Sequence, residues 1–247
     1  MSRTLVSVIV PNHDYGAFLA TAVESVVRQT HGPLELLILD DGSRDDSRDV
    51  AAALRAEHRH RFERFECLWL AGNGGKLRAL NQGIPLVRGE ITVILDADDY
   101  LAPEYVAQTV GVLLETRRRD PKVGFVYTDC WLVDTTGEML ARGRSTAFDR
   151  GLLRTSSYIP SCAPILTAAL RGATPFDECI LTGNKHHMWS RIVEEGWEGL
   201  YVSQPLFFYT MHDRNNSGIG RVILDEVARD VRHARILSGY WPRARVG

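Results

Sequence analysis

Residues 91–99, ITVILDADD, carry the signal around which the rest of the chain is organised. The first part is apolar and rich in β-branched residues, which is typical of a buried strand in a parallel sheet. Three carboxylates follow at Asp96, Asp98 and Asp99, at the carboxyl end of the strand, where open α/β sheets bind ligands. Neighbouring carboxylates repel one another, and a divalent cation with oxygen ligands would neutralise them. The stretch suggests a metal and diphosphate site, with a solvated acidic turn as the alternative.

The composition is that of an ordinary globular protein. Its 247 residues, 45% hydrophobic and 24% charged, suffice for one large α/β domain or two small ones, and a single sheet is the simpler arrangement. A net charge of −2 gives no electrostatic sign of nucleic acid as a partner. The four cysteines are widely spaced and form no CxxC pair, which favours reduced thiols over a zinc site.

The amino-terminal sequence shows no targeting or membrane signal. Its apolar run over residues 5–10 ends at Pro11 and is too short for the core of a signal peptide. No stretch approaches the length of a transmembrane helix. We therefore expect a cytoplasmic protein without a transmembrane segment.

Strands and helices alternate in the first hundred residues. The first strand is expected to stop at Pro11, because proline has no N–H and a fixed φ. This alternation predicts a parallel sheet of the nucleotide-binding type. The predicted strands are 5–10, 34–39, 67–70 and one beginning at 91, and the predicted helices are 17–29, about 45–57 and 77–87.

The second half has a less regular pattern. Residues 142–158 are predicted to form a mobile or substrate-facing loop with a short helix. Asn184 is predicted to cap a helix over 185–195. The other predicted elements are helices over 103–118 and 222–237, and strands over 123–128, 130–134, 138–141, 200–202 and 206–210.

Polar clusters follow three of the predicted strands: PNHD at 11–14, DDGS at 40–43 and DADD at 96–99. Because the carboxyl ends of parallel strands meet at one edge of a sheet, the three clusters are expected to converge on one crevice. No GxGxxG motif follows the first strand and no GxxxxGK[ST] motif occurs, which weighs against a dinucleotide-binding or P-loop protein.

These segments carry a family resemblance. The stretch VSVIVPNHDYGAFLATAVESVVRQTHGPLELLILDDGSRDDS, followed by NGGKLRALNQGI and GEITVILDADD, closely resembles the inverting family-two glycosyltransferases. The resemblance continues more thinly through FDECILTGNKHHMW and YTMHDRNNSG. It implies an α/β protein of the nucleotide-diphospho-sugar transferase (GT-A) type, with a mostly parallel central sheet flanked by helices and a smaller acceptor-side extension.

The resemblance also implies how the chain is divided. Residues 1–247 would form a single GT-A-like domain. Its nucleotide-sugar-binding half would be 1–99 and its acceptor-side half 100–220, with a helix and tail over 221–247. The donor would be a nucleotide sugar, with a UDP-sugar favoured, while the acceptor and a homodimeric state are left open.

Several residues match positions that bind the donor in this family. Lys76 resembles the basic residue that approaches the diphosphate, and Asp96 would contact the ribose or the metal. Asp98 would bind Mg²⁺ or Mn²⁺, and His212 matches a late histidine that can complete the metal shell. Asp99 and Asp41 are expected to support these residues rather than bind the metal. The implied base-pocket and nucleotide-sugar contacts are Pro11, Asn12, His13, Asp40, as acceptor of a hydrogen bond from the base, and Ala97.

One position departs from the family pattern. An ungapped match places Asn184 and Lys185 where an acidic pair usually supplies the base that deprotonates the acceptor. A protonated lysine cannot accept a proton, and only burial or a like charge would lower its pKa enough. His187 or His186 could serve as the base instead, the acceptor could need no strong base, or Lys185 could bind an acidic acceptor.

The remaining explanation is a protein that binds nucleotide sugar without efficient transfer. The intact donor motifs favour a transferase with Lys185 and His187 as the catalytic candidates, over a non-catalytic nucleotide-sugar-binding or partner-binding protein. A nucleotidyltransferase is disfavoured, because no Gly-rich loop with Arg or Lys follows the first strand.

Overall fold

The first half of the chain forms the strands and helices that its sequence pattern predicts. In the computed structural model, residues 4–212 and residue 215 are described. The strands are β1 (Val6–Asn12), β2 (Leu34–Asp40), β3 (Arg64–Trp69), β4 (Ile91–Ile94), β5 (Tyr100–Leu101), β6 (Val123–Val133), β7 (Met139–Gly143), β8 (Ile165–Leu166) and β9 (Glu198–Thr210). The helices are α1 (Gly16–Val27), α2 (Ser47–His58), α3 (Lys76–Gly83), α4 (Tyr105–Arg117), α5 (Arg150–Leu153), α6 (Thr167–Gly172) and α7 (Asn184–Glu194), with short 3₁₀ turns η1 (Arg59–Arg61) and η2 (Ile84–Leu86).

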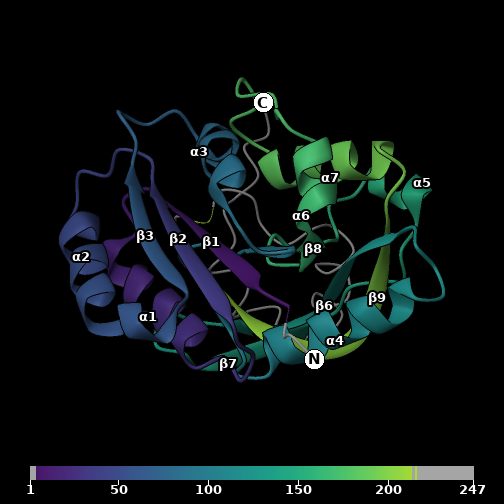
Figure 1. Cartoon of the computed structure of the whole chain (residues 1–247), viewed down its shortest axis with the longest axis horizontal. Coiled ribbons are helices and arrows are strands. Elements are labelled where there is room, and N and C mark those ends of the chain that lie inside the picture. The colour runs from purple at the N-terminus through teal and green to yellow at the C-terminus, as the bar shows by residue number, and fades with distance from the viewer. Residues whose placement is uncertain (1–3, 213–214, 216–247) are drawn as a thin grey trace.

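The strands form one sheet in the order β3-β2-β1-β4-β8-β6-β9-β5, and β7 pairs with β6. The neighbours β3, β2, β1 and β4 are parallel, as are β6 and β9. The short strand β8 is antiparallel to both β4 and β6 and so joins the two parallel groups. The predicted α/β class with a mostly parallel central sheet flanked by helices is confirmed (Figure 1).

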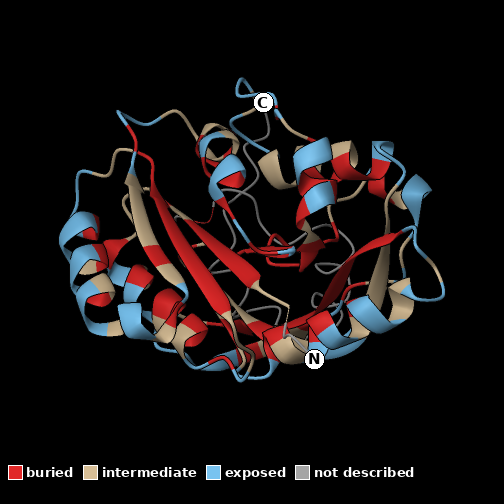
Figure 2. Ribbon diagram, viewed as in Figure 1, coloured by how far each residue is buried: buried red, intermediate tan, exposed pale blue. Residues whose placement is uncertain are grey.

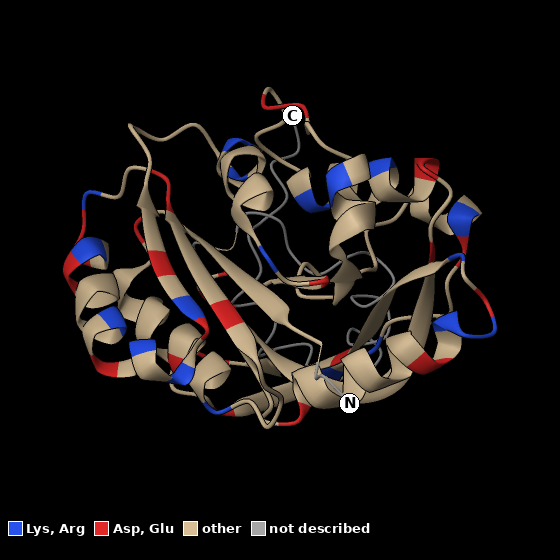
Figure 3. Ribbon diagram, viewed as in Figure 1, with Lys and Arg blue, Asp and Glu red and all other residues tan. Residues whose placement is uncertain are grey.

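Helices cover both faces of this sheet. Val8 and Val10 of β1 pack in one core with α1, α2 and α4, whereas Ile9 packs in a second core with α3, α6 and α7. This alternation follows from the two-residue period of side chains along a strand. The central strands are buried, while the helices expose their outer sides (Figure 2). On α2 these outer sides carry charges of both signs (Figure 3).

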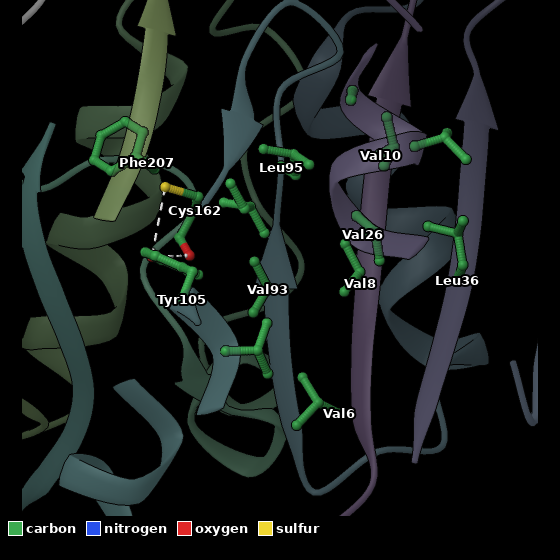
Figure 4. Packing of buried hydrophobic residues seen from close by; sticks show 14 of the residues in the cluster. Val6, Val8, Val10, Val26, Leu36, Val93, Leu95, Tyr105, Cys162 and Phe207 are labelled. Atoms are coloured by element: carbon green, nitrogen blue, oxygen red, sulfur yellow. Dashed lines mark hydrogen bonds between the residues drawn. The ribbon is translucent and has the colours of Figure 1, made fainter. Parts of the chain in front are cut away.

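The first core extends from β1 and β4 to the second half of the chain. Val8 and Val93 lie on adjacent strands, and Tyr105 and Phe207 pack in the same cluster (Figure 4). The Tyr105 hydroxyl donates a hydrogen bond to the carbonyl of Cys162 at 2.8 Å. The shared core therefore ties residues after Asp99 to the sheet that carries the acidic stretch.

Strand β1 does not stop at Pro11, contrary to the sequence-based expectation. It continues to Asn12, whose carbonyl accepts a hydrogen bond from the N–H of Asp41. Alternate residues of a parallel strand direct their N–H groups to opposite neighbours, and Ile9 faces β4, accepting from Leu95. Pro11 faces the same side, but β4 has already ended, so no ladder hydrogen bond is lost.

Strands β6 and β9 are each continuous, whereas the sequence predicted two short strands in each place. The predicted break in β6 fell at Asp129, a polar residue within an apolar pattern. Its buried carboxylate accepts hydrogen bonds from Arg142 at 2.8 Å and from the Tyr201 hydroxyl at 2.6 Å. Because these bonds compensate the burial of the charge, the strand continues with only a local shift in its pairing with β9.

Two further differences concern helices. Gly183, with φ of 68°, is the N-cap of α7, so Asn184 is the first helical residue and does not cap it. The helix predicted over 222–237 lies outside the described residues. Within the described part of the chain, every helix is too short or too polar to cross a lipid bilayer.

Candidate active site

A cavity of about 350 Å³ lies at the carboxyl ends of β1, β2 and β4, within the size range of small-molecule sites. The polar clusters that follow these strands do converge there. The cavity is lined by Pro11, Asn12, His13, Tyr15, Asp41, Asn73, Gly75, Lys76, Ala79, Asp96, Ala97, Asp98, Ser161, Leu181, Asn184, Lys185, Tyr209 and Asn215.

Most of the predicted site residues lie on this wall. Three do not: Asp40, His187 and His212. The predicted residues that line the cavity are Pro11, Asn12, His13, Lys76, Asp96, Ala97, Asp98 and Lys185.

Lys76 and Asp96 form an ion pair in the cavity wall. Lys76 is the first residue of α3, and its ammonium group donates hydrogen bonds to the Asp96 carboxylate and, at 3.1 Å, to the Ser161 hydroxyl. Gly75, with φ of 89°, makes the turn that brings the lysine to this place. One of the three carboxylates of the acidic stretch is thus neutralised by a cation of the protein itself.

Asp98 and His212 come together from positions 114 residues apart. The histidine Nε2 lies 3.1 Å from a carboxylate oxygen of Asp98, and the ring stacks on Phe18 with centroids 4.8 Å apart. Asn215 accepts a hydrogen bond from the backbone N–H of His212 at 2.7 Å. The two residues expected to bind a metal are therefore adjacent, with the histidine buried and held from both sides.

This pair fits a metal ion only if other ligands complete the shell. Among residues 4–212 and 215, no group of three or more His, Cys, Asp or Glu side chains is arranged to hold an ion. Mg²⁺ is usually bound by one or two protein carboxylates together with substrate phosphates and water. Asp98 and His212 thus fit an ion that a diphosphate helps to bind.

Asp99 lies beneath the cavity. It is buried and accepts a hydrogen bond from the N–H of Thr210 at 3.1 Å. Burial, and then the neighbouring charges of Asp98 and Asp96, raise the pKa of Asp99 well above its usual range. This carboxyl group therefore links the acidic stretch to the end of β9.

The structure corrects the expected position of Asp40. This residue is fully buried, and its carboxylate accepts hydrogen bonds from the Asn12 amide and the backbone N–H of Ser43, both at 3.0 Å. Asp40 therefore lies below the cavity wall and supports Asn12, which does line the cavity. The direct contact with a base that the resemblance implied is not provided by this geometry.

The adjacent residue Asp41 lines the cavity instead. Its carboxylate accepts hydrogen bonds from the backbone N–H groups of Gly74, at 3.0 Å, and Gly75, at 2.6 Å. These bonds hold the glycine-rich turn that precedes Lys76. Asp41 thus positions the lysine through the backbone.

Replacing Asp41 by alanine should lower the free energy of unfolding by about 1–3 kcal/mol, since the N–H of Gly74 would lose its acceptor and that of Gly75 would keep only Asn73. Urea unfolding checks the value. The matched control is Asp49→Ala on the exposed side of α2, for which we expect a change within about 0.5 kcal/mol. Equal losses in the two variants would contradict the role given to Asp41.

Two buried polar atoms of the cavity-lining residues Asn12 and His13 have no hydrogen-bond partner among the described residues. They are Oδ1 of Asn12 and Nδ1 of His13. Asn12 is only 3% exposed, and its amide nitrogen is already engaged by Asp40 and Ser43. Leaving a buried acceptor unsatisfied costs about 1–3 kcal/mol. A ligand with a donor group would recover this cost, so the wall around Asn12 is suited to a polar heterocycle.

Helix α7 carries both catalytic candidates, but it places only one in the cavity. Lys185 lines the cavity, and burial lowers its pKa, while the charge of Asp96 acts in the opposite direction. His187 lies outside the cavity lining, where its Nε2 accepts a hydrogen bond from the N–H of Asp177 at 3.2 Å. His187 is therefore not placed to act as a base on a substrate in this cavity.

Sequence reasoning assigned no role to several residues of the wall. Asn73 lay within a quoted motif, and its amide nitrogen is 2.8 Å from Nε2 of His13. No sequence motif pointed to Ser161, because this residue reaches the site only through the packing of the second half of the chain. Tyr15 and Tyr209 each lay within a segment quoted for the family resemblance but were given no role.

The sequence and fold were compared with those of known proteins. A sequence model described as glycosyl transferase family 2 matches residues 7–171. An uncharacterised glycosyltransferase from Nostoc sp. (strain PCC 7120) is 36% identical over 107 residues, covering 43% of this chain and 32% of that protein. In three curated relatives, including this one, the matched segment spans 30% to 39% of the relative's length.

Solved structures share the fold at low sequence identity. TarS from S. aureus, in a complex with UDP-GlcNAc, has a TM-score of 0.66 and 15% identity, covering 95% of this chain and 71% of that chain. The mannosyltransferase PcManGT from Pyrobaculum calidifontis, in complex with GDP-Man and Mn²⁺, has a TM-score of 0.66 and 19% identity, covering 87% and 59%. These likenesses confirm the predicted GT-A fold, and the match over residues 7–171 shows that the chain belongs to glycosyl transferase family 2.

Proposed function

We propose that this chain transfers a sugar from a nucleotide-diphosphate donor to an acceptor, with inversion by direct displacement. The observation that carries the proposal is one cavity whose wall combines two kinds of groups. The wall holds the charged groups of Asp96, Asp98 and Lys76, together with the unsatisfied polar atoms of Asn12 and His13. Membership of family 2 supports the same reaction.

These two sets of groups suggest how a nucleotide-sugar donor would lie in the cavity. The base would occupy the end lined by Asn12 and His13, where its polar groups would satisfy the buried side-chain atoms. The diphosphate would lie between Lys76 and Asp98. The sugar would then extend toward Lys185. A UDP-sugar is the first donor to test and a GDP-sugar the second, since proteins of this fold have been solved with each.

A divalent ion, Mg²⁺ or Mn²⁺, held by Asp98 and His212 would supply positive charge that stabilises the leaving diphosphate. Lys76 contributes a second positive charge from the protein. Its pairing with Asp96 and Ser161 fixes the ammonium group in place, so little reorganisation is needed when the leaving group becomes charged.

Of the two catalytic candidates, Lys185 and His187, Lys185 is the one that lines the cavity. An unprotonated Lys185 could take the acceptor proton, whereas a protonated Lys185 could only bind an anion.

A cytoplasmic location, a homodimer and the division into donor and acceptor halves stay predictions from the sequence.

A second candidate function is nucleotide-sugar binding without transfer. The observation in its favour concerns Lys185. This lysine lines the cavity at the position where a carboxylate is expected to act as the base. The two functions differ in product formation. Binding of UDP without any glycosylated product across a broad acceptor panel would favour the second.

The proposal is tested by a thermal-shift screen of UDP, GDP and their sugar derivatives, with and without Mn²⁺. A ligand at a hundred times its Kd should stabilise the protein by about 2.7 kcal/mol. For a chain of this size, that gain corresponds to a rise in Tm of roughly 5–10 °C. Mn²⁺ alone is the control. The absence of a shift with every nucleotide would overturn the donor-site assignment.

A further inference from the structure

Two lysines line the cavity, and they differ in their partners. Lys76 bonds to Asp96 and Ser161. Lys185 makes no hydrogen bond or ion pair with any residue in the described ranges, 4–212 and 215. Among the described residues, the cavity thus contains one compensated cation and one without a counter-ion.

Lys185 is half-buried, and no described residue supplies its counter-ion. Burial is the main cause of the lowered pKa of Lys185, so its ammonium group is partly removed from water. Buried charges in proteins are normally paired. The two carboxylates that act on Lys185 have other partners, because Asp96 is bound by Lys76 and Asp99 accepts from Thr210. An anion from outside the chain would complete the arrangement.

Lys185 lines the same cavity as Asp96 and Lys76. Besides burial, the groups that influence its pKa are Asp96, Lys76, Asp99 and the Cys130 thiol, and neither Asn12 nor His13 is among them. With the diphosphate between Lys76 and Asp98, the space next to Lys185 falls to the saccharide portion of the substrates. This placement rests on the proposed function.

The helix that carries Lys185 is firmly anchored. Met188 and Trp189 follow it in α7 and are buried in the core against α6 and β6. Gly183 starts the helix in a left-handed conformation. The ammonium group is therefore presented from a rigid element, as a specificity-determining residue should be.

We propose that Lys185 binds an anionic group, a carboxylate or a phosphate, on the saccharide that occupies this end of the cavity. The anion is carried either by the transferred sugar of the donor or by the acceptor. Lys185 then selects the substrate through its charge and is a specificity-determining residue of the transfer reaction.

The donor arm of the test compares binding of UDP-glucuronic acid and UDP-glucose by calorimetry in the presence of Mn²⁺. The acceptor arm uses protein saturated with UDP and Mn²⁺. It compares glucuronate with its uncharged methyl ester, and glucose 6-phosphate with glucose, by ligand-observed NMR titration. In at least one arm, the wild type should bind the charged compound about 10-fold more tightly, which corresponds to about 1.4 kcal/mol.

Three variants make the test specific. Lys185→Met should abolish the preference for the charged compound, while its Kd for UDP stays within about threefold of the wild-type value. Lys185→Arg should keep most of the preference, because arginine retains the charge but does not deprotonate near neutral pH. Lys122→Met, which removes the same charge from an exposed position outside the cavity, should leave the preference unchanged.

Each outcome decides the matter. The proposal is overturned by the absence of a charge preference in both arms, or by a preference that persists in Lys185→Met. It is also overturned if Lys185→Met mainly weakens UDP binding, because Lys185 would then serve the diphosphate. Failure of the wild type to bind either UDP or GDP would instead overturn the proposed function, so the two failures are distinguishable.

Discussion

Replacing Asp98 by asparagine is expected to lower the rate of UDP release from a donor sugar by a factor on the order of 10². Asp98 and His212 are the adjacent pair that fits a metal ion, and their histidine is already held by Phe18 and Asn215. Asparagine keeps the size of the side chain but removes its negative charge. The variant should therefore fold normally and bind the metal–diphosphate unit poorly.

Two measurements check this expectation. Calorimetry with UDP should show that Mn²⁺ strengthens binding in the wild type and has little effect in Asp98→Asn. An assay of UDP release reports the rate. Asp49→Asn, which neutralises an exposed carboxylate on α2, is the control and should behave as the wild type. An unchanged dependence on Mn²⁺ in Asp98→Asn would refute the assignment of Asp98 to the metal.

Much of the donor side of the site follows from local sequence. The apolar run before Asp96 predicts a buried parallel strand, and three polar clusters at strand ends predict one crevice. The structure does bring Asn12, Asp41 and Asp98 to one cavity. This success reflects a rule of topology, because parallel strands necessarily place their carboxyl ends at the same edge.

The choice between Asp40 and Asp41 could not be made in this way. The side chains of adjacent residues at a strand end point to opposite sides. If the predicted strand end is wrong by one residue, the buried carboxylate and the carboxylate in the cavity are interchanged. The hydrogen bonds that fix the outcome come from Asn12, Gly74 and Gly75, which lie about 30 residues away in sequence. Only the assembled loops show that Asp40 holds the Asn12 side chain, whereas Asp41 faces the cavity.

The two catalytic candidates on α7 illustrate a constraint that the sequence does contain. Lys185 and His187 are two positions apart, which on an α-helix separates their directions by about 200°. Both could not face one cavity, and the structure places Lys185 there. Deciding which of the two faces inward required the position of the apolar stripe, because Met188, Trp189 and Ile192 fix the rotation of the helix.

Replacing Trp189 by alanine should lower the free energy of unfolding by about 3–5 kcal/mol, the largest stability effect expected for this chain. The side chain is 1% exposed, and its ring centroid lies 4.7 Å from that of Phe125 on β6. Its removal would leave a cavity between α7 and the sheet. Because the same helix presents Lys185, we expect the loss of packing to weaken the charge preference proposed for that residue as well.

Urea unfolding followed by circular dichroism measures the loss, and the chain supplies a matched control. Trp69 is 39% exposed at the end of β3, where its ring contacts Arg48, so Trp69→Ala should cost no more than about 1 kcal/mol. Trp189→Phe should cost less than Trp189→Ala, since it retains an aromatic ring and removes an indole N–H that has no partner among the described residues. Similar losses for Trp69→Ala and Trp189→Ala would show that α7 is not anchored through Trp189, and the rigid presentation of Lys185 would then need another cause.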